Sequence, residues 1–328
     1  MAAAAFLSSQ TAATASELHY RTVFADQYAT GSSLVHAFFE VLSATGSPSG
    51  VIGTTREQDK ISKDLVKPFL DPAFQVQRAT GQRYAIGSYI PSDVDLFELE
   101  GIHVTRPSKD VLVVRYSAKT IATLPGEELV MSKTMAPRLT VFHWSSKESR
   151  WRVLSHANFN TPIAAICNDK PIVESPWSAG SDIGDQELGE QLMTNFFDLI
   201  EKGDARPMLH PLIQYQSANG VGYTTLAERQ ANSKFPRPYL DKPAVTRNGS
   251  LLVVTQYNTA DERVLMGKYQ LRGGKSSLIA TFMTENRGPW RLIAFASFAP
   301  AKTLPVDFQC KDPALQISAP LQTVPAAR

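Results

Sequence analysis

Two segments of the chain show the apolar spacing of an amphipathic helix. The segment LVHAFFEVL begins at Leu34 and LMTNFFDLI begins at Leu192, and both contain apolar residues spaced i, i+3, i+4 and i+7. In each segment a pair of Phe residues is followed by an acidic residue. The pattern predicts helices over residues 34–43 and 190–201.

Pairs of strand-like segments follow these helices in the same order. FQVQRATGQRY ends at Tyr84 and IQYQSANGVGY ends at Tyr223, and each predicts a strand, a tight turn and a second strand. VTRPSKDVLVVRY and VTRNGSLLVVTQY predict hairpins, and WRVLSHANFN from Trp151 and WRLIAFASFA from Trp290 predict a late strand. Segments such as LLVVTQY are apolar on both strand faces, which indicates sheets that are covered on both sides.

The two halves of the chain repeat at a nearly constant distance. Phe38 and Phe196 are 158 residues apart, and Trp151 and Trp290 are 139 residues apart. The difference corresponds to the Gly/Ser/Thr-rich segment SATGSPSGVIGTTREQDK, which predicts a loop that only the first half contains. The period is far longer than that of a solenoid repeat, so the repeat predicts two duplicated domains.

The repeat sets the expected domain organisation. We predict a flexible tail over 1–20, a first domain over 21–165, a linker over 166–185, a second domain over 186–304, and an irregular Pro-containing tail over 305–328. Helices followed by antiparallel strands are typical of the α+β class. Because both faces of each sheet are expected to be covered, we predict that the two sheets pack together as an internal pseudo-dimer.

This order of elements, with its late WRVLSHANF strand, resembles the nuclear-transport-factor-2-like (NTF2-like) superfamily, which includes SnoaL-like polyketide cyclases and ketosteroid isomerases. The resemblance covers residues 25–160 and 187–302. It implies two cone-shaped domains of the cystatin-like α+β type, in which a curved antiparallel sheet wraps around helices and encloses an apolar pocket. Family members often dimerise through their sheets. The catalytic sets of the family do not match this sequence, so no catalytic residue is transferred.

Composition narrows the expected partners and cofactors. Of the 328 residues 43% are hydrophobic and 20% are charged, and the formal net charge is +2. These values predict a globular protein without a nucleic-acid partner or a membrane-spanning segment. The six His residues lack metal-ligand spacing, so we expect no metal site and no cofactor. His143 is expected at the rim of the first pocket, opposite Arg152. A monomeric pseudo-dimer and a homo-oligomer both remain open.

The first pocket is expected to carry more polar groups than the second. His156 and Asn158 share strand parity with Leu154 and would be polar groups in an apolar pocket if that face is concave. Alternatively, both side chains satisfy backbone or inter-domain hydrogen bonds. The second half has Phe295 and Ser297 at the matching positions.

Aromatic residues of both halves are further candidates for lining the pockets. They are Tyr84, Tyr116, Phe39, Tyr223 and Phe197.

Three functional hypotheses follow from this pattern. The first is binding of a small apolar or aromatic organic ligand without chemistry. The second is an isomerase, cyclase or hydro-lyase that uses a His or Tyr of the first pocket as its acid–base group. The third is an interaction module whose cones are filled by side chains.

The two cysteines leave the compartment open. Cys167 and Cys310 each follow the last strand of their half, so a pseudo-two-fold arrangement would bring them into comparable places. A disulfide between them would indicate export, with a signal segment removed from this sequence, whereas two free thiols would indicate the cytoplasm. We favour the cytoplasm because the tails that carry the cysteines are irregular.

Thiol titration tests this preference. We expect two reactive thiols per chain when the protein is unfolded without reductant, because Cys167 and Cys310 are then unpaired. A titration that detects no thiol until reductant is added would instead show a Cys167–Cys310 disulfide.

Overall fold

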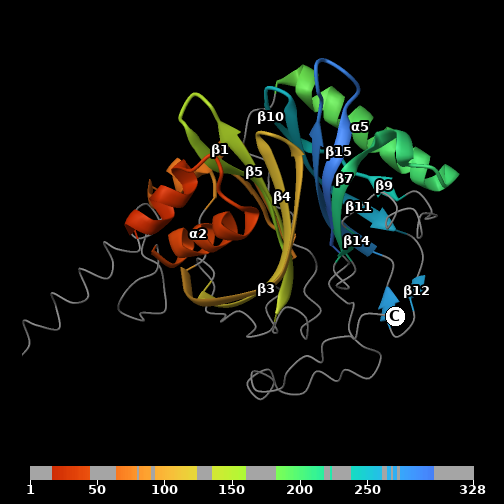
Figure 1. Cartoon of the computed structure of the whole chain (residues 1–328). Coiled ribbons are helices and arrows are strands. Elements are labelled where there is room, and N and C mark those ends of the chain that lie inside the picture. The colour runs from red at the N-terminus through yellow and green to blue at the C-terminus, as the bar shows by residue number, and fades with distance from the viewer. Residues whose placement is uncertain are drawn as a thin grey trace, which may run out of the picture.

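Two curved sheets lie face to face, and each carries a helix on its outer side (Figure 1). No described helix is long and apolar enough to cross a membrane. The computed structural model describes residues 17–44, 64–79, 81–89, 93–123, 135–159, 182–217, 222–223, 238–260, 264–266, 269–271 and 274–298. Cys167 and Cys310 lie outside these residues.

The described residues of the first half contain a long helix, which the apolar spacing predicted, and a six-stranded sheet. Its elements are α2 (Gly31–Ala44), the 3-10 turn η1 (Lys67–Phe69), β1 (Leu70–Arg78), β2 (Arg83–Ala85), β3 (Asp93–Ser108), β4 (Val111–Thr123), β5 (Ala136–Ser145) and β6 (Arg150–Asn158).

The second half repeats this series and adds a short strand and a small separate hairpin. The repeated elements are α5 (Ile183–Lys202), η2 (Arg206–Met208), β7 (Leu209–Ser217), β8 (Gly222–Tyr223), β10 (Ala244–Asn248), β11 (Leu251–Ala260), β14 (Gly274–Met283) and β15 (Arg291–Ser297). The additions are β9 (Tyr239–Leu240) and the hairpin β12 (Val264–Met266) with β13 (Tyr269–Leu271).

The two sheets have matching strand orders, β2-β1-β6-β5-β4-β3 and β8-β7-β15-β14-β11-β10. Neighbouring strands are antiparallel except for β1–β6 and β7–β15, which are parallel. Antiparallel pairs were expected throughout. The parallel pair in each sheet joins the first long strand of that half to its last strand, and no hairpin connects the two to set their direction. Leu70 pairs with Val153, and Leu209 pairs with Leu292. The partners in the two halves are thus 139 residues apart, like the two tryptophans, which supports the predicted duplication.

A glycine in each long helix allows the helix to approach its sheet closely. A Cβ atom added to Gly31 would lie 2.7 Å from Cγ1 of Val104, and one added to Gly189 would overlap Cγ2 of Val245. Real Cβ atoms do not come this close, so a larger side chain would force helix and sheet apart. Gly31 and Gly189 are 158 residues apart, as are the Phe pairs of the same helices.

Helix boundaries lie close to the predicted domain boundaries. Residues 17–20, which were placed at the end of the N-terminal tail, are helical. Tyr20 is buried there, edge-on to Phe69 with ring centroids 5.5 Å apart. Residues 183–185 of the predicted linker begin α5, where the side chain of Asp182 accepts a hydrogen bond from Gly184 N at 2.7 Å.

Buried apolar residues form three cores. The first lies between the first sheet and its helices, and we call the space that it occupies the first cone. The second core fills the corresponding second cone. The third core lies between the two sheets and takes residues from both, including Val113, Val141, Val253 and Ile279. The third core explains the strands that are apolar on both faces, because each sheet is covered by helices on one side and by the other sheet on the opposite side.

A buried glutamine of the first sheet reaches into the second. The side-chain amide nitrogen of Gln75 on β1 lies 2.9 Å from the carbonyl oxygen of Val253 and 2.9 Å from Oγ1 of Thr246. It also lies 3.3 Å from the carbonyl oxygen of Ala244. Gln75 is fully buried, so these bonds form without competition from water.

The equivalent glutamine of the second sheet makes the corresponding contacts with the first sheet. Gln214 on β7 places its amide nitrogen 2.7 Å from the carbonyl oxygen of Val113, 3.0 Å from that of His103 and 3.2 Å from Oγ1 of Thr105. The partners occupy equivalent positions on equivalent strands. Reciprocal contacts of this kind are the signature of a two-fold interface, here formed within one chain.

Phe159 and Phe298 complete the contact between the sheets. Their rings are stacked, with centroids 4.2 Å apart and an angle of 17° between the planes. The two residues are 139 positions apart and therefore equivalent. Two equivalent residues that touch each other lie at the pseudo-two-fold axis.

The glutamines provide a test of this interface. Gln75→Ala and Gln214→Ala are each expected to lower the free energy of unfolding by about 2–3 kcal/mol, because each removes several buried hydrogen bonds between the sheets and leaves a cavity in place of the side chain. Urea unfolding measures the change, and Asn195→Ala on the exposed face of α5 is the control. A loss below about 0.5 kcal/mol in both Gln variants would contradict the role of these bonds.

Candidate functional site

A row of polar side chains crosses four neighbouring strands on the helix-covered face of the first sheet. Arg78 on β1 pairs in register with Asn158 on β6, Asn158 pairs with Arg138 on β5, and Arg138 pairs with Tyr116 on β4. Residues in register on adjacent strands point to the same face of a sheet. Tyr116 belongs to the first core, so this row faces the first cone.

A second, shorter row lies next to it and is linked to it by hydrogen bonds. His156 on β6 pairs in register with Thr140 on β5. The Nδ1 atom of His156 lies 2.9 Å from Oγ1 of Thr140, which in turn lies 3.0 Å from the hydroxyl oxygen of Tyr116. All three residues are buried. The three side chains therefore form one continuous hydrogen-bonded chain inside the cone.

Helix α2 covers this chain with aromatic rings. The ring of Phe38 is edge-on to that of His156, with centroids 5.5 Å apart. The ring of Phe39 lies 6.1 Å from that of Tyr116 and 5.3 Å from that of Phe97 on β3. The helix presents both phenylalanines to the sheet because its apolar stripe faces the core.

Burial and two arginines keep His156 neutral. Burial, followed by the positive charges of Arg138 and Arg78, lowers the pKa of His156 to about 3. Burial also lowers the pKa of Arg138 to about 10 and raises the pKa of Tyr116. At neutral pH the site therefore combines an uncharged imidazole and an uncharged phenol with two buried guanidinium groups.

The positive charge of Arg138 is held by backbone oxygens. Its Nη1 atom donates to the carbonyl oxygen of Pro137 at 2.9 Å and lies 3.4 Å from that of Ala136. Within the described part of the chain, no carboxylate forms an ion pair with Arg138. Arg78 lies over the ring of Tyr84, 5.0 Å from its centroid.

Partly exposed apolar side chains border the first core. Tyr84, Ile86, Phe97, Leu99 and Ile102 pack against that core but are only half-buried, so solvent reaches its edge. Apolar walls that surround a few convergent polar groups are typical of small-molecule sites.

The second cone lacks this polar set. Ser217, Ser297, Leu278 and Gln256 form the row that corresponds to Arg78, Asn158, Arg138 and Tyr116. This row contains no charge.

Apolar residues also replace the hydrogen-bonded pair of the first cone. Phe295 and Ala280 pair in register at the positions of His156 and Thr140. The ring of Phe295 stacks on Tyr215 at 5.8 Å and lies 5.1 Å from that of Phe196, so it fills the space. The first cone is the more polar one, as the sequence predicted.

The predicted site residues divide between the two cones. His156, Asn158, Tyr84, Tyr116 and Phe39 all belong to the first, as described above. The hydrogen bond of the His156 side chain described above goes to Thr140 of its own domain.

In the second cone, Phe197 is buried, and its ring centroid lies 6.4 Å from that of Phe295. The side chain of Tyr223 lies outside the described residues. His143 lies opposite Arg152 as expected, but its Nδ1 atom contacts the carboxylate of Asp71 at 2.9 Å, next to Asn248 of the second sheet. It is therefore at the sheet contact and not at a pocket rim.

Sequence reasoning missed the two arginines of the site. Each stands near one end of its strand, where a charged residue is usually exposed. Strand alternation could have indicated their position. Arg78 points to the same strand face as Phe74 and Val76, and Arg138 points to the same face as Phe142. Those apolar neighbours all belong to the first core.

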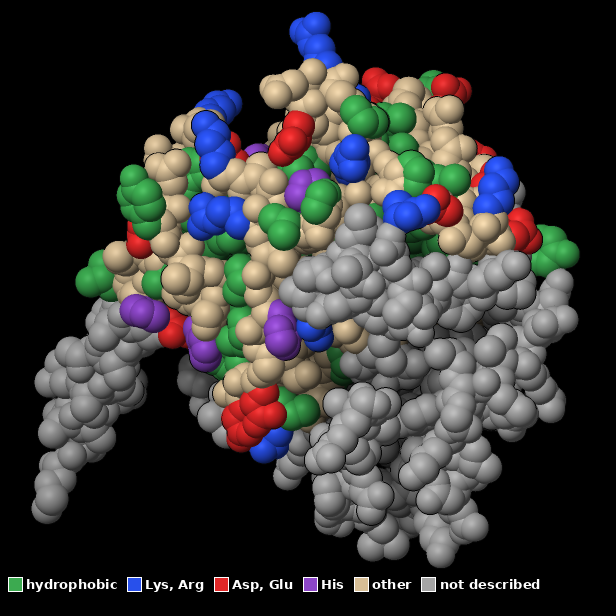
Figure 2. Space-filling view, turned by 45° about the vertical axis from the view of Figure 1, so that its right-hand side comes forward, with side chains coloured by type: hydrophobic (Ala, Val, Ile, Leu, Met, Phe, Trp, Pro, Cys, Tyr) green, Lys and Arg blue, Asp and Glu red, His purple; other side chains and the backbone are tan. Residues whose placement is uncertain are grey.

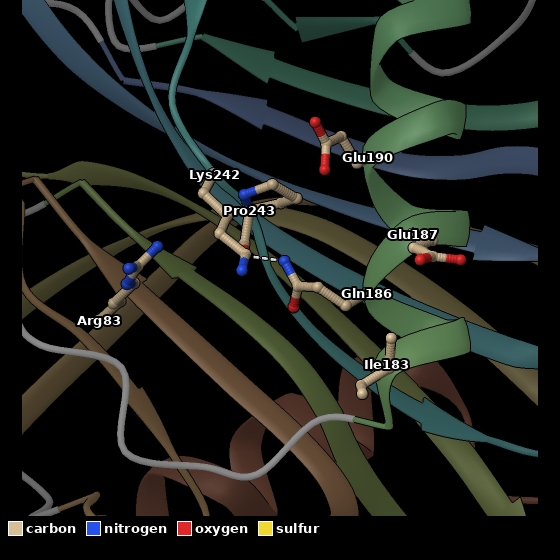
Figure 3. A pocket seen from close by; sticks show the side chains of 7 residues that line it. All are labelled: Arg83, Ile183, Gln186, Glu187, Glu190, Lys242 and Pro243. Atoms are coloured by element: carbon tan, nitrogen blue, oxygen red, sulfur yellow. Dashed lines mark hydrogen bonds between the residues drawn. The ribbon is translucent and has the colours of Figure 1, made fainter.

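A separate pocket of about 590 Å³ lies between β2 and the first turns of α5 (Figure 3). Its charged lining mixes both signs, since Arg83 and Lys242 oppose Glu187 and Glu190. On the face shown in Figure 2, acidic and basic side chains also alternate over the described surface. Three or more His, Cys, Asp or Glu residues do not gather at a possible metal position anywhere in the described ranges.

Comparison with known proteins bears on the fold. No protein-family model and no curated protein sequence matches this chain. Solved structures do match. They include a putative ketosteroid isomerase from Shewanella frigidimarina (14% identity over 36% of this chain and 99% of that one, TM-score 0.30). A second is an NTF2-like protein of unknown function from Pseudomonas putida (16% identity over 40% of this chain and 99% of that one, TM-score 0.30). A third is an uncharacterized protein with a cystatin-like fold from Caulobacter vibrioides (14% identity over 35% of this chain and 90% of that one, TM-score 0.31).

The chain is similar to NTF2-like proteins. Each of these matches covers 35–40% of this chain. At these identities and TM-scores, the similarity carries no information about activity.

The neutral state of His156 predicts the pH dependence of stability. Its pKa is about 3 in the folded chain and 6.5 in the unfolded chain, so the unfolded state takes up a proton first as the pH falls. The contribution of His156 to the free energy of unfolding is therefore present above about pH 6.5 and is lost progressively as the pH falls towards 3. Between pH 7.5 and 5.0 this group accounts for a loss of about 2 kcal/mol.

Substitution tests this assignment. His156→Phe, which introduces the residue of the second half, should reduce the loss of unfolding free energy between pH 7.5 and 5.0 by about 2 kcal/mol. The control His36→Gln removes an exposed histidine and should leave the pH dependence unchanged. An identical pH profile for His156→Phe and the unsubstituted chain would show that His156 titrates normally in the folded state.

Proposed function

We propose that the first domain binds a small organic ligand with an aromatic or apolar body, and that the second domain is its structural partner. The observation that carries this proposal is the contrast between the two cones. The first has a continuous polar set beneath aromatic rings, whereas the second has Phe295, Leu278 and Ala280 at the corresponding positions.

The second cone indicates that the polar set is not required by the fold. Burying charged and hydrogen-bonding groups costs free energy, and a sheet of the same order and register forms without them. Groups that a fold can replace with apolar residues are better explained by a role in recognition. This reasoning supports a ligand site in the first cone.

The protonation states favour binding over acid–base catalysis. An efficient general base has a pKa near the working pH, whereas the pKa of His156 is about 3. The pKa of Tyr116 is raised, so its hydroxyl keeps its proton and serves as a hydrogen-bonding group. Both side chains are thus suited to orienting a ligand without exchanging protons with it.

The third hypothesis, an interaction module with filled cones, is supported most directly in the second half. There Phe295 packs between Tyr215 and Phe196 and takes the place of the polar chain. We therefore assign the ligand to the first cone and a stabilising role to the second domain, whose sheet covers the back of the first.

A matched pair of substitutions tests the proposal. Binding of 2-naphthoate and 2-naphthamide to the full chain is measured by isothermal titration calorimetry, and we expect one site per chain for at least one probe. Phe39→Leu should weaken that binding roughly fivefold, because it removes an aromatic contact worth about 1 kcal/mol. Phe197→Leu, the equivalent change in the second cone, should leave the affinity unchanged.

Two outcomes would contradict the proposal. One is the absence of binding by either probe at millimolar concentration. The other is binding that depends on Phe197 as strongly as on Phe39. Urea unfolding of both variants verifies that each remains folded during the titration.

A further inference from the structure

The first cone contains two buried cations within one row of the sheet. Arg78 is 5% exposed and Arg138 is 1% exposed, and Asn158 stands between them in register. Adjacent strands are about 4.8 Å apart, so the two arginine Cα atoms are about 10 Å apart and both side chains project to the same face. Both guanidinium groups therefore lie on the cone side of the sheet.

This arrangement is costly in a protein that binds nothing there. Moving a guanidinium group out of water is unfavourable, and two like charges in one cone repel each other. The hydrogen bonds of Arg138 go to backbone carbonyls, and no described carboxylate forms an ion pair with it. Ser217 and Leu278 replace the two arginines in the second half, so folding does not require them.

We propose that the ligand of the first cone is an organic carboxylate, with its negative charge held by Arg138 and Arg78. This inference rests on the proposed function, because it names the class of ligand for the same site. The planar guanidinium group matches the two oxygens of a carboxylate and forms charge-assisted hydrogen bonds with it. The negative charge of the ligand supplies a counter-charge for Arg138.

The remaining groups of the cone suit the rest of such a ligand. Asn158 lies between the arginines and carries an amide that donates and accepts. The neutral imidazole of His156 and the hydroxyl of Tyr116 add uncharged polar groups, and they place no negative charge against the carboxylate. Phe39 and Phe97 offer an apolar wall for an aromatic or aliphatic body.

A comparison of an acid with its amide tests the charge preference. 2-Naphthoate and 2-naphthamide have the same ring system and differ in charge. At pH 7.5, we expect 2-naphthoate to bind the full chain at least tenfold more tightly than 2-naphthamide, because charge-assisted bonds are the stronger ones. Equal affinity of the two probes would overturn the carboxylate proposal and leave the proposed function standing, whereas failure of both probes would overturn the proposed function itself.

Substitution of the arginines locates the preference. Arg138→Leu introduces the residue of the second half and should bring the affinities of the two probes within about threefold of each other, with the amide affinity unchanged. Arg78→Gln should also reduce the preference for the acid. Arg287→Gln removes an exposed cation in a turn and is the matched control, expected to retain the full preference.

The arginine variants also keep the proposal testable if one of them binds poorly for structural reasons. Thermal unfolding verifies that Arg138→Leu and Arg78→Gln remain folded without ligand. A stable Arg138→Leu protein that still prefers the acid tenfold, together with an Arg78→Gln protein that does the same, would overturn the assignment to these residues.

Discussion

Two buried glutamines hold the two sheets of this chain together, and the rest of the structure depends on the contact that they make. Gln75 and Gln214 each extend an amide across the gap to backbone oxygens of the opposite sheet, at equivalent positions. Because each amide bonds to particular oxygens of the opposite sheet, the two sheets fit in one relative position. The stacked rings of Phe159 and Phe298 lie at the centre of that arrangement.

Fixing this contact also determines which residues face the cones. When one face of each sheet packs against the other sheet, the alternate residues of each strand point to the opposite face, towards the helices. On β5, Leu139 and Val141 enter the core between the sheets, while Arg138 and Thr140 face the first cone. The polar set of the first cone is therefore placed by the interface behind it.

The sequence predicted the features that depend on apolar periodicity and repetition. The long helices, the hairpins and the packing of sheet on sheet follow from residue spacing, and the offset of 139 residues identified His156 and Phe295 as equivalents. The parallel pairing of the first and last long strands was missed, because no local signal states which distant strands become neighbours.

The charged part of the site was harder to anticipate. A strand pattern shows that Arg78 and Arg138 share a face with apolar residues, but charged residues near strand ends are usually solvated. Only the assembled cone shows that both are enclosed. His143 was misplaced for a related reason, since its partner Asp71 is 72 residues away and Asn248 belongs to the other domain.

The covalent link between the halves has a consequence for how such a protein can diversify. In a symmetric assembly of two identical chains, every change of residue appears twice, so a charge placed in one cavity is also placed in the other, and its cost is doubled. A single gene that encodes both halves removes this restriction. Here one cone holds arginine, histidine and tyrosine while the equivalent row of the other cone holds no charge, so the second half can stabilise the fold while the first serves recognition. Fusion thus separates two demands that an identical pair must satisfy with the same residues.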